Sequence, residues 1–497
     1  MKKSKPNKYL VIFFVVPALI VIVSGAEFEV KAQGTDVWSP PYIIPGFTKY
    51  VLSPYLVADQ NRAVHAFVSD FVGEDESEKV IYYSRWTRDQ GWTLPTDILL
   101  SPHHQARVKG VYLDQKEMMH VVFVGVEDNN AEIYYSRAPA ARANRAQSWS
   151  KPVIVGEKAI TPDEAAITGY DRGNIHVVFG AALDGNSLYS VHSSDGGETW
   201  SDPKPIYLTY SDTLWPSHLN IYTDSLNNVH AVWSVGDLTG NGLAVYYAKL
   251  AAGTFNWTEP IVLAEAVGFE ADTPSIIEHN NELFVVYHND APTTRWMRRS
   301  GDGGQSWSEP IRLFPHIGTN GAASMVVDSG GILHMFFGNR VTGTPIIYGM
   351  WHSTWLGTSW SKPVPIISGL KTDEFDPSFA NAVVSQGNTI LVTWHEDPQA
   401  KNSKGAKFSY LNLDTPEYPT SPLSTVSFRS AVIPTESVVQ PTIEPTATPN
   451  NIGIQNHGDI QFFMSSDPLT LILFGIVPAI GLLFLFFLLR LGRRNRK

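Results

Sequence analysis

The sequence contains no cysteine among its 497 residues, so disulfide bonds and thiolate-bound metal sites are excluded. A fold without such crosslinks has to be held by an apolar core, and a chain of this length can form a large one. Charged residues are also scarce, at 17% of the chain, whereas there are 38 glycines, 33 prolines and 12% aromatic residues. This composition favours an all-β protein in which many short strands are joined by turns.

An apolar segment lies near each end of the chain. Residues 1–26 begin with four lysines, continue with an apolar run and end with small residues, which is typical of an export signal peptide; an uncleaved anchor is the alternative. Residues 469–489 contain no charge over 21 residues, enough for one transmembrane helix. The basic residues in 490–497 predict a cytoplasmic tail. We therefore expect a single-pass cell-membrane protein whose remaining chain lies outside the cell.

The part of the chain between these segments is acidic. The two segments and the tail hold nine of the 37 basic residues and no acidic residue, so 37 − 9 = 28 basic residues face 48 acidic ones. Binding of nucleic acid requires a basic footprint, and this function class is therefore excluded.

Two regions of different character make up this outer part. Residues 414–468 are rich in Pro, Thr and Ser and bury too little apolar surface to fold, so they predict an extended stalk. Residues 35–413 repeat a Trp, often followed by Pro and aliphatic residues, at spacings of 54, 57, 51, 57, 50 and 53 residues; the seven members are Trp38, Trp92, Trp149, Trp200, Trp257, Trp307 and Trp360. Such a period predicts a β-propeller of four-stranded blades.

The ends of the repeat array predict how the ring closes. The first Trp strand has no strands before it, and the last unit, residues 375–413, has three strands and no Trp strand. An N-terminal strand that completes the last blade would remove an open sheet edge. We expect seven blades by this count, with six as the alternative.

Two turns carry a recognisable motif, Ser-x-Asp-x-Gly-x-Thr/Ser-Trp. It is formed by Ser193, Asp195, Gly197, Thr199 and Trp200, and again by Ser300, Asp302, Gly304, Ser306 and Trp307. In these residues the chain resembles the sialidase (neuraminidase) superfamily of BNR, or Asp-box, repeat β-propellers. The resemblance implies that the motif is structural and lies on the face opposite the active site.

A sialidase also requires three arginines, a Tyr nucleophile with a Glu, and an acid/base Asp. The first arginine belongs to a Phe/Tyr-Arg-Ile-Pro motif, whose nearest match here is Tyr42-Ile43-Ile44-Pro45, without the arginine. Sialidase catalysis is therefore not expected, and the protein is interpreted as a non-enzyme. If it is an enzyme, we expect an exo-glycosidase of sialidase type. Weak candidates for catalysis are Glu396, Asp376 and Asp272.

The loops between blades, and between the second and third strands, should share one end of the channel. They are acidic, which suits a neutral glycan, a cation or a basic protein surface. Residues specific to single blades there are the candidates for ligand binding: Trp394, His395, Trp233, Tyr287, His288, Trp215, His218, Arg107 and Arg340. Histidines that recur at one strand position, such as His65 and His120, are interpreted as structural. No metal or cofactor is expected, with calcium in an acidic loop as the alternative.

These observations lead to one main hypothesis. The protein is a membrane-anchored, sialidase-like propeller on the cell surface that recognises a carbohydrate or a protein ligand without sialidase catalysis. The alternative is an exo-acting, exo-α-sialidase-like glycoside hydrolase, and a surface spacer is a third hypothesis.

Overall fold

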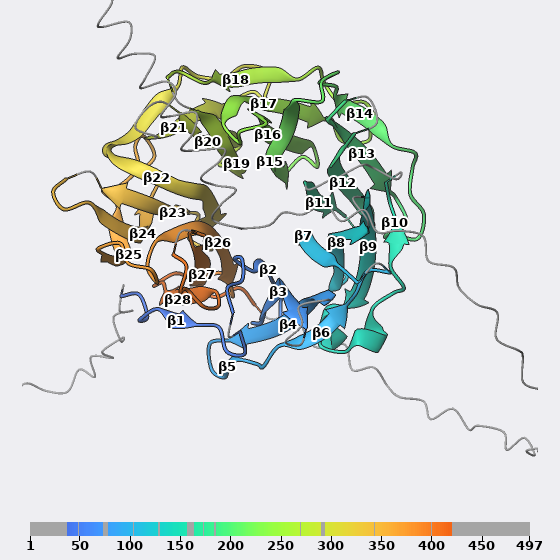
Figure 1. The fold of residues 1–497 in the computed structure, drawn as a ribbon, viewed down its shortest axis with the longest axis horizontal. Helices are drawn as coiled ribbons and strands as arrows, with labels where there is room; N and C mark the ends of the chain where they lie inside the picture. Colours follow the sequence, from blue (N-terminus) through green and yellow to red (C-terminus); the bar gives the residue numbers. More distant parts are fainter. Residues whose placement is uncertain are drawn as a thin grey trace, which may run out of the picture. The chain divides into compact units, whose positions relative to one another are not determined.

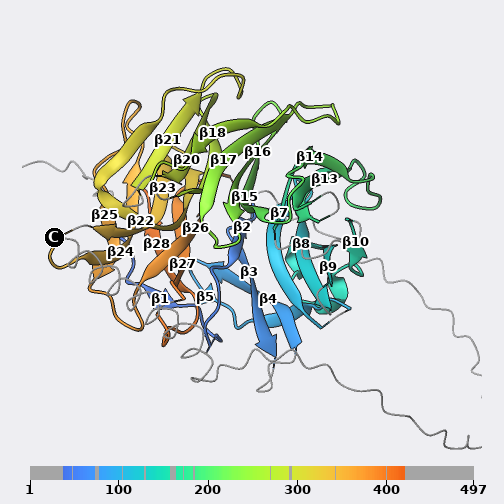
Figure 2. The same cartoon turned by 45° about the horizontal axis from the view of Figure 1, so that its top comes forward.

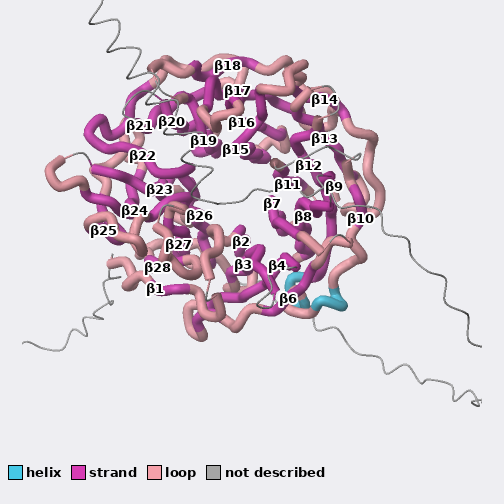
Figure 3. The backbone as a smooth tube through the Cα atoms, viewed as in Figure 1, coloured by secondary structure: helices cyan, strands magenta, loops and turns pink. Residues whose placement is uncertain are grey.

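The structure is a computed structural model that describes residues 37–419, except 48, 73–77, 103, 128–129, 157–163, 172, 183–184, 269, 290–293, 342 and 399. All of these residues belong to the first of two compact units, Met1–Ser424 and Thr425–Lys497. They form antiparallel sheets arranged in a ring (Figure 1), and the only helical turns in the described part are two short 3-10 turns, η1 (Ala140–Arg142) and η2 (Ala146–Ser148) (Figure 3). The predicted all-β propeller is confirmed.

Four of the sheets have four strands each. In spatial order they are β1 (Tyr42–Ile43), β28 (Lys407–Asn412), β27 (Thr389–Glu396) and β26 (Pro377–Ser385); β10 (Val153–Ile154), β9 (Asn130–Pro139), β8 (Met118–Glu127) and β7 (Ala106–Leu113); β11 (Ala165–Tyr170), β12 (Asn174–Ala181), β13 (Ser187–Ser193) and β14 (Lys204–Tyr207); and β15 (Leu214–Thr223), β16 (Val229–Asp237), β17 (Gly242–Leu250) and β18 (Ile261–Glu265).

The other two sheets are larger. One has five strands: β2 (Tyr55–Ala58), β3 (Val64–Val72), β4 (Glu78–Thr87), β5 (Gly91–Trp92) and β6 (Thr96–Leu99). The other has seven: β19 (Ala271–His279), β20 (Glu282–Asn289), β21 (Thr294–Ser300), β22 (Ile311–Val327), β23 (Leu333–Val341), β24 (Ile347–Thr354) and β25 (Val364–Gly369). The inner strands β2, β7, β11, β15, β19 and β26 face the middle of the ring (Figure 2).

The blade count differs from the sequence expectation. The described residues form six separate sheets, and neither seven nor six equal blades of four strands describes them. The cause is β22, which pairs with β21 through Ile311–Leu313 and then continues without a break to pair with β23 through Ile317–Val327. The last strand of one repeat and the first strand of the next are thus one strand, which joins two repeats into the seven-stranded sheet.

The predicted closure of the ring is confirmed. Tyr42 in β1 is the register partner of Phe408 in β28, so an N-terminal strand completes the C-terminal sheet. The edge of β28 is thereby paired instead of being left open. Second strands such as β16 and β27 are buried along almost their whole length, and each has an apolar stretch at its centre.

The recurring histidines form a structural hydrogen-bond chain in three repeats. In the first of them Tyr83 Oη lies 2.7 Å from His65 Nδ1, and His65 Nε2 lies 3.2 Å from Asp59 Oδ2, whose other oxygen accepts amide protons of the preceding turn. The corresponding sets are Asp224, His230 and Tyr247, and Asp328, His334 and His352. In a fourth repeat His120 Nδ1 lies 2.6 Å from Tyr135 Oη, while its Nε2 lies 3.6 Å from Asp114. The interpretation of these histidines as structural is confirmed.

The two motif turns are ordered by their Asp side chains. Asp302 Oδ1 accepts the Ser300 hydroxyl at 2.8 Å and the Ser306 amide at 2.9 Å, and Asp195 does the same in its turn. The Ser306 hydroxyl, which donates to the other carboxylate oxygen, and these two hydrogen bonds hold the pKa of Asp302 below its ordinary value. The ring of Trp307 lies 4.9 Å from that of Tyr247 in the neighbouring repeat, so the turn locks one repeat onto the next.

Both predicted membrane segments, residues 1–26 and 469–489, lie outside the described residues, as do the tail 490–497 and nearly all of the stalk. In the described part of the chain, no helix has the length and apolarity that a membrane crossing demands.

Candidate functional site

Bulges in the inner strands decide which side chains face the middle of the ring. The register of β15 shifts after Ser217 and that of β26 after Ser378, with further shifts in β7, β19 and β22. One residue in each of the first two bulges has a positive φ, 50° at His218 and 47° at Phe379. Such a backbone is costly for residues other than glycine, and a bulge re-aims the side chain that it carries.

Two adjoining cavities lie against these inner strands. The larger has a volume of about 750 Å³ and is lined by residues of β3, β7, β15, β19, β22 and β26. The smaller has about 630 Å³ and lies among the sheets that contain β7, β11 and β15. Arg107, Glu164 and His218 line both cavities, and we call the two cavities together the cleft.

A His–Asp pair lies at the junction of the two cavities. Asp272 Oδ1 is 2.8 Å from His218 Nδ1 and also accepts the Ser234 hydroxyl and, at 2.7 Å, the Thr273 amide. The His218 side chain keeps 36% of its surface exposed, whereas that of Asp272 keeps 9%. Burial lowers the pKa of His218, but the hydrogen bond and charge of Asp272, with the charges of Glu164 and Glu270, more than offset this and raise its pKa.

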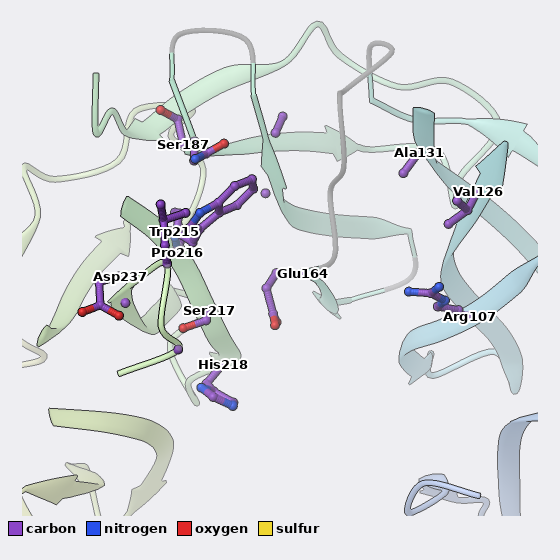
Figure 4. A pocket seen from close by; sticks show the side chains of 16 residues that line it. Arg107, Val126, Ala131, Glu164, Ser187, Trp215, Pro216, Ser217, His218 and Asp237 are labelled. Carbon is purple, nitrogen blue, oxygen red and sulfur yellow. The ribbon is translucent and has the colours of Figure 1, made fainter. Parts of the chain in front are cut away.

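Arg107 faces this pair across the smaller cavity. In Figure 4 the guanidinium of Arg107 points from β7 toward Glu164, while Trp215 and His218 approach from β15 on the other side. The carboxylate of Glu164 is 3.4 Å from the Leu219 amide. The cleft thus presents a cation, a carboxylate, an imidazole and an indole ring to one space.

The larger cavity is not predominantly acidic. Its charged lining residues are three cations and two carboxylates: Lys79, Arg107 and Lys109, with Asp70 and Glu164. His218, whose pKa the Asp272 carboxylate raises, also lines this cavity. The acidic mouth was predicted from acidic loop residues. Most of these belong to 73–77, 128, 184 and 290, which lie outside the described residues.

A stack of aromatic rings crosses the larger cavity. The ring of Phe379 lies 6.2 Å from His218 and 5.3 Å from His395, and Tyr50 meets His395 edge-on at 6.0 Å. His395 Nδ1 accepts the Ser53 amide at 3.1 Å. Flat apolar rings beside polar groups are suited to the faces of sugar rings.

Comparisons with known proteins show the fold at low sequence identity. No family model and no curated protein matches the chain. Among solved structures, a PL25 ulvan lyase bound to -[GlcA(1-4)Rha3S]- is 12% identical at a TM-score of 0.50, with 75% of this chain and 96% of that chain covered. The NanB sialidase from Streptococcus pneumoniae is 12% identical at 0.41, with 77% and 70% covered. The fold is that of the sialidase-like β-propellers. At these identities the likeness concerns the fold alone.

In this sialidase-like propeller the motif turns lie at the end opposite the cleft, as the resemblance implied. Ser193, where one motif begins, pairs with Ile175 at the start of β12, whereas Ser187, at the other end of β13, pairs with Ala181 and lines the cleft. The residues of the two motifs therefore belong to the scaffold.

Four of the predicted ligand-binding residues do line the cleft: Trp215, His218, His395 and Arg107. Four others are buried in the core and line neither cavity: Trp394, Trp233, Tyr287 and His288. Their strands are buried on both faces, and this turns the large aromatic rings into packing groups. Among the described residues, no three side chains of the metal-ligating types converge on a candidate metal site.

Glu396, Asp376 and Arg340 belong to an ion-pair network away from the cleft. Both carboxylate side chains are fully buried; Asp376 lies 3.1 Å from Lys371 and 3.3 Å from Arg340, and Glu396 lies 2.7 Å from Lys407. Burial raises the pKa of Glu396 against the lowering effect of Lys407. Neither carboxylate lines a cavity, and this position favours a structural role.

Replacing Asp376 by asparagine is expected to destabilise the fold by about 2–4 kcal/mol, because Arg340 and Lys371 would lose their buried counter-charge. Urea denaturation would measure the change, and the exposed Asp89→Asn serves as the matched control. Ligand binding per folded molecule should stay as it is. A loss of binding without a loss of stability would instead place Asp376 in the functional site.

Sequence reasoning missed Glu164 and Phe379. A signal for Glu164 was present, because it precedes His218 by 54 residues, and His218 precedes Asp272 by 54, one repeat in each case. For Phe379 the signal is the tripeptide Pro-Ser-aromatic, which occurs at 216–218 and again at 377–379, the two bulges described above.

Proposed function

We propose that this protein recognises an acidic glycan in the cleft. The observation that carries the proposal is the convergence of Arg107, Glu164 and His218 on both cavities, beside the rings of Trp215 and Phe379. Guanidinium groups bind carboxylate and sulfate groups through charge-assisted hydrogen bonds, and aromatic rings pack against sugar faces. The similar ulvan lyase structure, with its bound glucuronate-containing glycan, agrees with this ligand class.

The size of the cleft favours an extended ligand. Together the two cavities span inner strands from most of the ring, whereas a single terminal sugar would occupy one of them. The exo-glycosidase alternative has less support, because its candidate residues Glu396 and Asp376 are closed off in ion pairs.

We further propose that the propeller is displayed on the cell surface. This part rests on the sequence of residues 1–26, 414–468 and 469–489 alone. Protease treatment of intact cells would test it: the propeller should be released while the tail 490–497 stays protected.

Glycan-array binding by the purified full-length protein, followed by calorimetry with acidic oligosaccharides, tests the recognition. Arg107→Gln is expected to weaken binding about 10- to 100-fold. A hydrogen bond to a charged group contributes about 1.5–3 kcal/mol, and its loss corresponds to a change of this size. The exposed Arg142→Gln is the matched control and should bind like the unaltered protein. Equal binding by the Arg107 variant, or preference for neutral glycans, would contradict the proposal.

A further inference from the structure

Arg295 on β21 is a buried cation that no carboxylate of the described residues neutralises. The residue is 1% exposed, and its Nε and Nη1 atoms have no hydrogen-bond partner in the described part of the chain. Its Nη2 atom donates one long hydrogen bond, of 3.4 Å, to the Gly321 carbonyl. Burial lowers the pKa of Arg295 to about 9, and the guanidinium therefore still carries its charge at neutral pH.

The carboxylate in the same row of the sheet bonds to other groups. Asp272, His288 and Arg295 are successive register partners on β19, β20 and β21, so the imidazole separates the carboxylate from the guanidinium. Asp272 bonds to His218 and Ser234 instead. Burial and then the charge of Arg295 lower the pKa of His288, which is thus neutral and offers no counter-charge.

Further buried polar groups without partners lie on the neighbouring repeat. The guanidinium of Arg295 lies 5.0 Å from the ring of Phe337 on β23. Asn339 is two residues further along this strand, so its side chain is on the same face, and Thr319 on β22 is its register partner. The Asn339 amide and the Thr319 hydroxyl are buried and have no hydrogen-bond partner among the described residues. Such groups are rare in folded proteins and indicate a bound ion or water.

The chemistry of these groups selects an anion. The guanidinium, the carboxamide NH2 and the hydroxyl are all hydrogen-bond donors. Water could satisfy their hydrogen bonds, but it would leave the charge of Arg295 uncompensated, and a buried unpaired charge is costly. Because the side chains are closed off from solvent, the site suits a monatomic anion and excludes sugars and phosphate esters.

We propose that a chloride ion binds between β21 and the β22–β23 pair, held by Arg295 with Asn339 and Thr319. These three residues line neither cavity, so the site is separate from the cleft and the inference does not depend on the proposed glycan recognition. The ion would supply the counter-charge of Arg295 and link the two repeats that share β22.

The test is thermal unfolding of the purified full-length protein in sodium chloride and in sodium gluconate at equal ionic strength, because gluconate is too large for a buried site. Chloride should raise the Tm by about 2–4 °C, and the rise should saturate, as expected for a ligand of the folded state. Arg295→Met, which keeps a long side chain without the charge, should abolish the rise. Arg312→Met, at an exposed arginine on β22, is the matched control and should keep it.

Two results would overturn the inference. Equal Tm values of the unaltered protein in the two salts would mean that water alone serves these groups, and a rise that persists in Arg295→Met would mean that chloride acts elsewhere. If Arg295→Met does not fold, Thr319→Val decides. It removes one donor at nearly constant volume and should raise the chloride concentration of half-maximal effect about 10-fold, whereas an unchanged concentration counts against the site.

Discussion

Replacing Gly304 by alanine is expected to destabilise the propeller by about 2–4 kcal/mol. Gly304 has a φ of 87°, and a Cβ atom there would lie 1.7 Å from Tyr247 Oη. The left-handed backbone costs about 1 kcal/mol for alanine, and overpacking typically adds about 1–3 kcal/mol. Tyr247 has little freedom to retreat, because its hydroxyl is 2.8 Å from His230 Nδ1.

The same turn supplies the matched control. Gly301 has no atom within 4 Å of the position of an added Cβ, so Gly301→Ala should leave the free energy of unfolding nearly unchanged. Urea denaturation of both variants measures the difference. A second substitution, Tyr247→Phe, removes the clashing oxygen and should recover part of the loss in the Gly304 variant. Equal stability of the two glycine variants would refute the packing argument.

This contact explains why the fold could be read from the sequence. Each motif places a Gly and a Trp against a Tyr of the preceding repeat: Gly304 and Trp307 against Tyr247, and Gly197 and Trp200 against Tyr135. The interaction between repeats therefore fixes residue types at a constant spacing, and the spacing is visible in the chain. The closing strand could be predicted for a similar reason, since an incomplete last repeat requires a partner for its edge.

The continuous strand β22 could not be predicted in this way. Whether one repeat's outer strand runs on into the next repeat's inner strand depends on the backbone path between Leu313 and Ile317, and both halves of β22 keep an ordinary strand pattern. Side-chain periodicity carries no information about that path. The number of separate sheets consequently differs from the number of repeats.

The residues of the candidate site could be predicted only in part. His218 and Asp272 are both candidates from their place at the mouth, and their pairing follows from equivalent positions one repeat apart. The aromatic residues that end the second strands, such as Trp394, occupy the core instead. The second strands that carry these aromatic residues are buried on both faces, so their place near the mouth does not expose them to a ligand.

Acid is expected to destabilise the propeller well above the pKa range of its carboxylates. Burial lowers the pKa of His176 to about 4, that of His352 to about 3 and that of His395 to about 4, and it also lowers the pKa of the histidines in the Asp–His–Tyr chains. These rings are neutral in the folded protein at pH values where the unfolded chain, with an ordinary pKa of about 6.5, already binds protons.

The sign follows from proton uptake. Above about pH 6.5 neither state is protonated at these histidines, and stability is at its full value. As the pH falls below this point the unfolded state gains protons that the folded state excludes. Each such histidine then costs on the order of 1 kcal/mol per pH unit until its folded pKa is reached. His218 changes stability in the opposite direction, because its folded pKa is raised, but it is one group against several.

Urea denaturation at pH 7.5, 6 and 5 measures this loss. His176→Phe removes one buried titrating ring whose neighbours are the aromatic rings of Tyr170 and His192, and it should make the fall in stability between pH 6 and pH 5 shallower. His104→Gln, at an exposed position, should leave the fall unchanged. Equal stability at pH 7.5 and pH 5 would contradict this prediction. It would mean that the buried histidines bind protons without unfolding, so that each Asp–His–Tyr chain would contain an Asp–imidazolium ion pair beside a neutral Tyr.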